Sequence, residues 1–278
     1  MTLTSSIPSR TAVARRHAGR ATPRWVLVAA EIVVPVLLVA WWWVASADST
    51  NPFFPPLQSI LARLVELAPT PAFLRDVGSS VGNLVLSFVL ACVIGVVLGA
   101  ALGLVRGLAW FVEPTVHFFR AIPPVALVPI FVSLIGFGNE TRILSITIAA
   151  VFPVLISTMD GIRATEPTLG MVSRVYRLGR ADRLFSVTLP AASPRILSGM
   201  QVSLMTAFVV MIASEMLGSS TGLGAATLLA QQSFAITDMW VGIIVLGILG
   251  YVSTALFTLF RRRVLRWYIA SQQQEKNS

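Results

Sequence analysis

The stretch from Ile162 to Ile196, IRATEPTLGMVSRVYRLGRADRLFSVTLPAASPRI, is a polar island between long apolar segments. It contains six arginines, and it ends in the run Leu189-Pro190 followed by AASP. In a chain whose other segments are apolar enough for lipid, such a segment must lie in water or against another protein. Basic residues favour the cytoplasmic side of a membrane, so we expect the island to present a surface there.

The composition excludes an ordinary soluble domain, because 55% of the 278 residues are hydrophobic and only 12% are charged. A net charge of +9 is also typical of nucleic-acid-binding proteins. The arginines, however, form blocks beside apolar segments and no continuous basic face. The single cysteine, Cys92, lies within an apolar run, which excludes a disulfide framework and a cysteine-based metal site. We interpret it as a small packing residue.

Six segments are long and apolar enough to cross a bilayer, for which about 20 residues are needed. The fold class predicted is therefore an all-α polytopic membrane protein with six transmembrane helices, at 25–46, 78–104, 112–135, 141–161, 197–218 and 239–260. With the amino terminus inside, 17 of the 21 basic residues fall on the cytoplasmic side and three fall outside. This asymmetry predicts a multi-pass protein of the bacterial cell membrane with both termini in the cytoplasm.

The chain divides into four parts. Residues 1–24 are a basic segment, which resembles a transit peptide in composition but which we interpret as a cytoplasmic tail. The first anchor and an outer amphipathic segment follow at 25–76, then a transmembrane core at 77–268 that includes the island 162–196, and a tail at 269–278. In the outer segment, residues 57–68 place their leucines and isoleucine on one helical face. This helix would either cap the bundle or help to seat an external protein.

The third apolar segment is interrupted by Pro123, Pro124 and Pro129. Proline removes a backbone donor and bends a helix, so the segment is either a kinked packing helix or a helix that lines a pathway. Arg120 lies just before the prolines and shares a helical face with Glu113 and His117. The three side chains either form a network, or the first two lie at the interface and Arg120 alone is buried.

Glycines gather in two further segments of the chain, one inside an apolar span and one in a turn. Gly95, Gly99 and Gly103 form a stripe that predicts close helix packing, within the chain or against a second copy. Glu215 precedes a glycine-rich turn, Gly218 to Gly224, that lacks the Gly-Lys-Ser/Thr ending of a phosphate-binding loop. We therefore expect a flexible outer turn without a nucleotide. The sequence offers no metal-spaced His/Cys cluster and no Ser-His-Asp set, so we predict no catalytic residue, metal or cofactor, and any energy source must come from elsewhere.

The island and several other runs resemble the permeases of ABC importers. The run Val187 to Gly199, VTLPAASPRILSG, is similar to their coupling loop, which contacts the ATPase. Supporting runs are Phe119 to Pro129, FRAIPPVALVP, then Ala213 to Leu217, ASEML, and the pair Arg266-Trp267. The likeness covers about residues 51–268 and is closest to the branch that handles aliphatic sulfonates, taurine, nitrate and related solutes.

One departure from this family lies in the island. The family's loop has a Glu-Ala-Ala-like triplet followed, after three residues, by glycine. Aligned without gaps from Leu189-Pro190, the glutamate falls on Met171 and the glycine on Arg177, whereas Gly179 would fit only if the loop were two residues shorter. In the ungapped alignment, the resemblance implies a short coupling helix at 173–178. The residues implied in ATPase contact are Ser173, Arg174, Val175, Tyr176, Arg177, Leu178, Gly179, Leu189 and Pro190.

The resemblance also implies partners and a role. Two permease copies, most simply a homodimer, would form the translocation path, two cytoplasmic ATPase subunits would grip the coupling helices, and an external binding protein would deliver a small solute. Candidate path or gating residues are Arg120, Pro123, Pro124 and Glu215. The solute would cross unmodified, so the chain itself would not be an enzyme.

Two other functions of a membrane protein would leave different patterns in the sequence. An ion-coupled secondary transporter would show internal repeats and paired acidic residues in its spans, and a membrane enzyme would show clustered nucleophile or metal ligands. Neither pattern is present in the sequence.

Overall fold

The computed structural model describes residues 24–165 and 167–268, and this part of the chain is helical without strands. The predicted tails 1–24 and 269–278 lie outside the described residues, apart from Arg24, where α1 begins. The helices in chain order are α1 (Arg24–Ser46), α2 (Leu57–Leu67), α3 (Pro71–Leu104), α4 (Arg106–Ala121), the 3-10 turn η1 (Pro124–Leu127), α5 (Val128–Ile135), α6 (Asn139–Arg163), α7 (Pro167–Val175), α8 (Arg180–Arg183), the π turn η2 (Leu184–Thr188), α9 (Leu189–Gly218), α10 (Leu223–Gln232) and α11 (Ile236–Val264).

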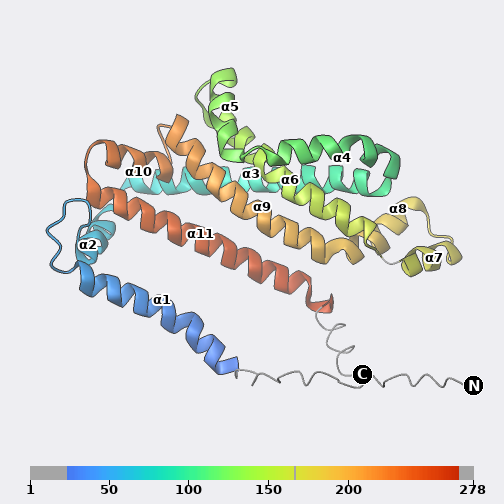
Figure 1. Ribbon diagram of the computed structural model, residues 1–278, viewed down its shortest axis with the longest axis horizontal. Coiled ribbons are helices and arrows are strands. Elements are labelled where there is room, and N and C mark those ends of the chain that lie inside the picture. Colours follow the sequence, from blue (N-terminus) through green and yellow to red (C-terminus); the bar gives the residue numbers. More distant parts are fainter. Residues whose placement is uncertain (1–23, 166, 269–278) are drawn as a thin grey trace, which may run out of the picture.

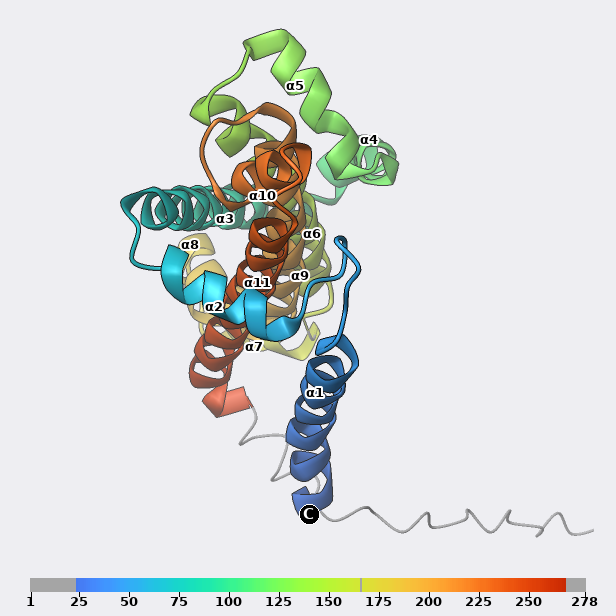
Figure 2. The ribbon, with the colours of Figure 1, turned by 90° about the vertical axis from the view of Figure 1, so that its left-hand side faces the viewer.

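Four long helices form the bundle. Helices α3, α6, α9 and α11 extend between two ends, one of which carries α2 and α10 and the other α7 and α8 (Figure 1). We call these the α10 end and the α7 end. Helix α1 packs near α2 at its carboxyl-terminal end, and the rest of the helix diverges from the bundle (Figure 2).

The packing of α3 on α6 depends on the predicted glycine stripe. A Cβ added at Gly99 would lie 2.5 Å from the carbonyl oxygen of Leu155 and 2.7 Å from the Cβ of Thr158. Gly95 and Gly103 meet other residues of α6 at similarly short range. Only glycine allows the two backbones to approach this closely, so the stripe serves packing within the chain.

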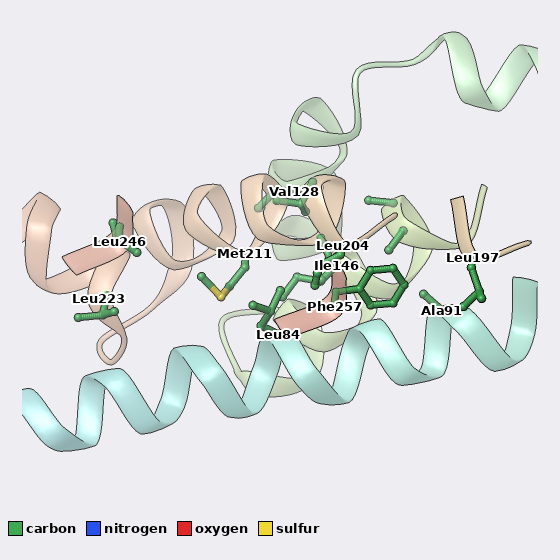
Figure 3. Packing of buried hydrophobic residues seen from close by; sticks show 14 of the residues in the cluster. Leu84, Ala91, Val128, Ile146, Leu197, Leu204, Met211, Leu223, Leu246 and Phe257 are labelled. Carbon is green, nitrogen blue, oxygen red and sulfur yellow. The ribbon is translucent and has the colours of Figure 1, made fainter. Parts of the chain in front are cut away.

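The hydrophobic core lies where the helices meet. Figure 3 shows Leu84 of α3 next to Ile146 of α6 and Leu204 of α9, and Ala91 of α3 next to Leu197 of α9 and Phe257 of α11. Many other apolar side chains of α3 and α11 are exposed on the single chain. A helix with an apolar outer face needs lipid or a second chain around it, as a membrane protein has.

The predicted spans agree with the structure in most places. Helices α3, α6 and α11, and the continuous helical segment Arg180–Gly218, are each long and apolar enough to cross a membrane. The described apolar part of α1 is shorter, at Val33–Ser46. The fold class is confirmed, but the expected count of six full spans is not exact.

The third predicted span, 112–135, is wrong as a single helix. Helices α4 and α5 are bent by 88° at the break between Ala121 and Pro124. Ile122 and Pro123 adopt extended ψ angles of 126° and 121°, because a residue before proline is driven out of the helical region. The segment is therefore a broken span or a re-entrant loop, and not a kinked helix.

At the α10 end, aromatic residues fasten α1 to α11. The rings of Trp42, Phe54 and Trp240 lie within 5.5–6.3 Å of one another, and the Trp240 indole N–H donates to the carbonyl of Phe53 at 3.1 Å. The predicted amphipathic helix is α2. Its buried face, with Ile60, packs on α11, so it caps the bundle.

Candidate coupling surface

The candidate site for contact with a partner protein is the loop between α6 and α9, which contains α7. Helix α7 begins at Pro167, where the missing proline N–H costs nothing because the first helical amides have no acceptor. It lies at the end of the bundle, beyond the long helices (Figure 1).

Helix α7 ends in a Schellman motif, and this corrects the predicted coupling helix at 173–178. The N–H of Leu178 donates to the carbonyl of Ser173 and that of Arg177 to the carbonyl of Arg174, both at 3.0 Å. Arg177 has a φ of +52°, so the helix cannot continue through it. The helix therefore spans 167–175, and Tyr176 to Gly179 form the turn that follows it.

The left-handed residue of this motif is the position where the ungapped alignment expects glycine. Glycine is the usual residue there because it has no Cβ to clash with the neighbouring carbonyl. Gly179 has a φ of −59°, which any residue adopts. The backbone therefore favours the ungapped register, with Arg177 at the glycine position.

Exposed apolar side chains surround the end of α7. Val175, Tyr176, Met171 and Leu178 are 80%, 75%, 57% and 41% exposed. Ser173 is buried instead, and its hydroxyl donates to the carbonyl of Gly170 at 2.9 Å. Exposed apolar side chains gathered at one end of a helix on a basic loop are typical of a protein interaction site.

Both ends of the loop connect to tightly packed helices. A Cβ at Gly161 of α6 would lie 3.2 Å from the Cβ of Ala192 in α9, and one at Gly199 would lie 2.3 Å from Ser157. Since packed helices transmit displacement as rigid bodies, a force on α7 would move α6 and α9 together.

Leu189 and Pro190 lie in the first turn of α9, so this helix begins inside the segment 162–196 that we expected between spans. The π turn η2 comes directly before them. Pro190 has no N–H to donate to Ser186, and the wider turn accommodates the missing bond. The hydroxyl of Thr188 donates to the carbonyl of Arg183 at 3.1 Å and closes this turn.

The predicted path residues are divided between two places. Arg120, Pro123 and Pro124 lie at the α4–α5 break, where Arg120 is exposed on the chain. Glu113 pairs instead with Arg163 of α6 at 2.7 Å, and His117 is exposed. The expected network of Glu113, His117 and Arg120 is therefore absent, and Arg120 is exposed on the single chain.

Glu215 lies at the α10 end and is fully buried. Its carboxylate accepts the hydroxyl of Ser80 at 2.8 Å and the N–H of Gly224 at 2.9 Å, while the N–H of Leu223 donates to the Ser80 oxygen. Gly222 donates its N–H to Asp76. The expectation of a flexible outer turn is wrong, because these bonds hold the turn and the start of α10 against the buried carboxyl group of Glu215.

The partners of Glu215 were not found from the sequence. Ser80 and Asp76 lie on one face of α3, four residues apart, more than 130 residues from Glu215. Arg142 is one of the three basic residues that the sequence placed outside, but it is 9% exposed and donates to the carbonyl of Thr221 at 3.1 Å. The available signal was the spacing of Asp76 and Ser80, because polar residues at i and i+4 of a membrane helix indicate a polar partner on that face.

Residues 91–266 match the family model described as the inner membrane component of binding-protein-dependent transport systems. The chain belongs to this family. The matched region includes α7, the Schellman turn and the α8–α9 connection.

Individual relatives within this permease family lie in one branch. A putative aliphatic sulfonates transport permease of Bacillus subtilis is 33% identical over 56% of this chain and 57% of its own length. The taurine transport system permease of Escherichia coli is 28% identical over 91% of this chain and 95% of its own. A bicarbonate transport system permease of Synechococcus elongatus is 31% identical over 56% of each. Apart from the taurine permease, the chain thus spans little more than half of these relatives.

A solved structure supports the fold of this permease. A chain of the MetNI methionine ABC transporter in an inward-facing conformation aligns with a TM-score of 0.61 and 21% identity, over 69% of this chain and 96% of that one.

Proposed function

We propose that this protein is the permease subunit of an ATP-driven ABC importer, and that α7 is the helix gripped by its ATPase. The observation that carries the proposal is the exposed apolar end of α7, which is mounted on two packed helices. Family membership supports it, because the binding-protein-dependent transport systems are named for an external binding protein.

In this mechanism, the ATPase subunits approach each other when they bind ATP. Helix α7 follows its ATPase subunit, and the close contacts of Gly161 and Gly199 transmit the displacement to α6 and α9. The spans then switch between two arrangements, which is rigid-body coupling through a two-state element. ATP hydrolysis occurs in the partner, so this chain performs no catalysis.

The solute we propose is a small compound with an oxyanion group, such as a sulfonate, taurine or nitrate. The relatives named for sulfonates, taurine and bicarbonate support this class, since each of these solutes carries such a group. Arg120 is exposed beside the break at Pro123 and Pro124. We propose that its positive charge attracts the oxyanion group of the solute along the path.

We further propose that both termini face the cytoplasm, that two copies form the path, and that the external protein docks at the α10 end. The charge asymmetry supports this orientation, because the α7 end carries the arginines of the island and Arg261, Arg262 and Arg263 of α11. The exposed apolar faces of α4 and α5 provide surface for a second copy.

The test is the ratio of solute uptake to ATP hydrolysis in proteoliposomes that hold the complete importer. Arg174→Glu reverses a charge on α7 and should lower uptake per ATP at least tenfold. Arg262→Glu makes the same change at an exposed position of α11 and should leave the ratio unchanged. Uptake driven by a proton or sodium gradient, without ATP or binding protein, would instead establish a secondary transporter.

A further inference from the structure

A basic cavity lies beside the coupling surface, where α3 and α6 end. Its volume is about 940 Å³, and four arginines line it: Arg163, Arg174, Arg180 and Arg183. They come from α6, α7 and α8, so the fold of the loop brings the charges together.

Most of this charge is not neutralised within the described part of the chain. Arg163 is paired with Glu113. Arg174, Arg180 and Arg183 have no ion pair or hydrogen bond from their side chains to any residue of 24–165 or 167–268. Like charges in one cavity repel, so an anion bound among them would be stabilised.

Apart from Thr165 and Thr188, the side chains of the rest of the cavity wall are apolar. Leu104, Val105, Ile162 and Phe185 line it together with the arginines. Leu104 is the last residue of α3, so this wall lies where a membrane-spanning helix reaches the interface. An anionic group with a hydrocarbon portion fits such a surface better than a single carboxylate of a protein partner, which would leave the apolar wall uncovered.

We propose that this cavity binds the phosphate group of an anionic phospholipid of the inner leaflet. Guanidinium groups of Arg180 and Arg183 would donate to the phosphate oxygens, and the first methylene groups of the acyl chains would cover Leu104 and Phe185. Such a lipid would join α7 and α8 to the inner ends of the spans. The assignment to the inner leaflet depends on the orientation proposed above, whereas binding itself does not depend on the importer function.

The experiment is native mass spectrometry of the full chain, delipidated in detergent and titrated with phosphatidylglycerol or, at matched acyl chains, phosphatidylcholine. The wild type should prefer phosphatidylglycerol. Arg180→Gln/Arg183→Gln should weaken its binding about 25-fold, or about fivefold for each basic residue near an anionic headgroup. Arg262→Gln/Arg263→Gln removes two exposed arginines from α11 and should leave the affinity unchanged.

Two further measurements identify the source of the anion. Arg180→Gln alone changes an exposed side chain that has no hydrogen bond or ion pair to the described residues, so it should retain the fold and lose about fivefold in affinity even if the double variant fails to fold. Inorganic phosphate, titrated without lipid in a thermal-shift assay, should stabilise the wild type less than phosphatidylglycerol does.

Three results would overturn the proposal. Equal affinity of the wild type and the Arg180 variant for phosphatidylglycerol would remove the arginines from binding. Equal stabilisation by inorganic phosphate would assign the cavity to a free oxyanion. Complete loss of bound lipid when the wild-type chain forms a complex with its ATPase would assign the cavity to acidic residues of that partner.

Discussion

Replacing Arg177 by glycine should stabilise the end of α7, because Arg177 holds the left-handed position of the Schellman motif with a φ of +52°. This conformation costs a residue that has a Cβ about 1 kcal/mol more than it costs glycine. The proper comparison is Arg177→Ala, which removes the exposed side chain but keeps the Cβ.

The magnitude can be measured at one amide. The N–H of Leu178, which donates to Ser173, is released when the motif opens. A gain of about 1 kcal/mol lowers the opening constant about fivefold, so the exchange of this amide with deuterium should be about fivefold slower in Arg177→Gly than in Arg177→Ala. The assay is hydrogen exchange of the full chain in detergent, read by mass spectrometry over 173–179.

A control decides between the two alignments of the loop. If Gly179 were the glycine that the family requires, Gly179→Ala would speed the exchange of Leu178. We expect no change, because Gly179 has a φ of −59°. Equal exchange in Arg177→Gly and Arg177→Ala would refute the reasoning, since no left-handed strain would then exist at this position.

Three further changes test the packing. Gly99→Ala should destabilise the protein by about 1–3 kcal/mol, since its Cβ would lie 2.5 Å from a backbone oxygen, whereas Gly78→Ala, with no atom within 4 Å, should be neutral or stabilising in thermal melts. Glu215→Ala should cost about 3 kcal/mol and expose the 218–224 turn to protease, because the donors of the buried carboxylate lose their acceptor. A double-mutant cycle of Glu113→Ala and Arg163→Ala should show a coupling of about 0.5–1 kcal/mol that shrinks with salt, since both side chains are about 30% exposed.

The apolar pattern of the sequence predicted the long helices well. The predicted spans 141–161 and 239–260 lie inside α6 and α11, each of which is only a few residues longer at its ends. The glycine stripe also predicted close packing correctly, because spacing by four residues places all three glycines on one side of a helix. These features are local and depend only on neighbouring residues.

The places where sequence reasoning failed depend on contacts between distant residues or on one backbone angle. Three prolines predicted an interruption of the third apolar segment, but they did not give the 88° angle between α4 and α5. Glu215 was expected beside a flexible outer turn as a candidate path residue, but it is buried, and its donors Ser80 and Gly224 come from two other helices. The end of α7 was predicted three residues too late, at Leu178 and not at Val175, because a left-handed arginine gives no signal in the sequence.

The central claim is that α7 couples this permease to an ATPase. The most direct measurement is affinity purification of the tagged chain from mild detergent, in the wild type, Arg174→Glu and Arg262→Glu. We predict that an ATPase subunit and a second permease copy elute with the wild type and the Arg262 variant, and that less ATPase elutes with the Arg174 variant. A wild-type chain that elutes as a monomer without an ATPase, under conditions that preserve a known importer, would contradict the account.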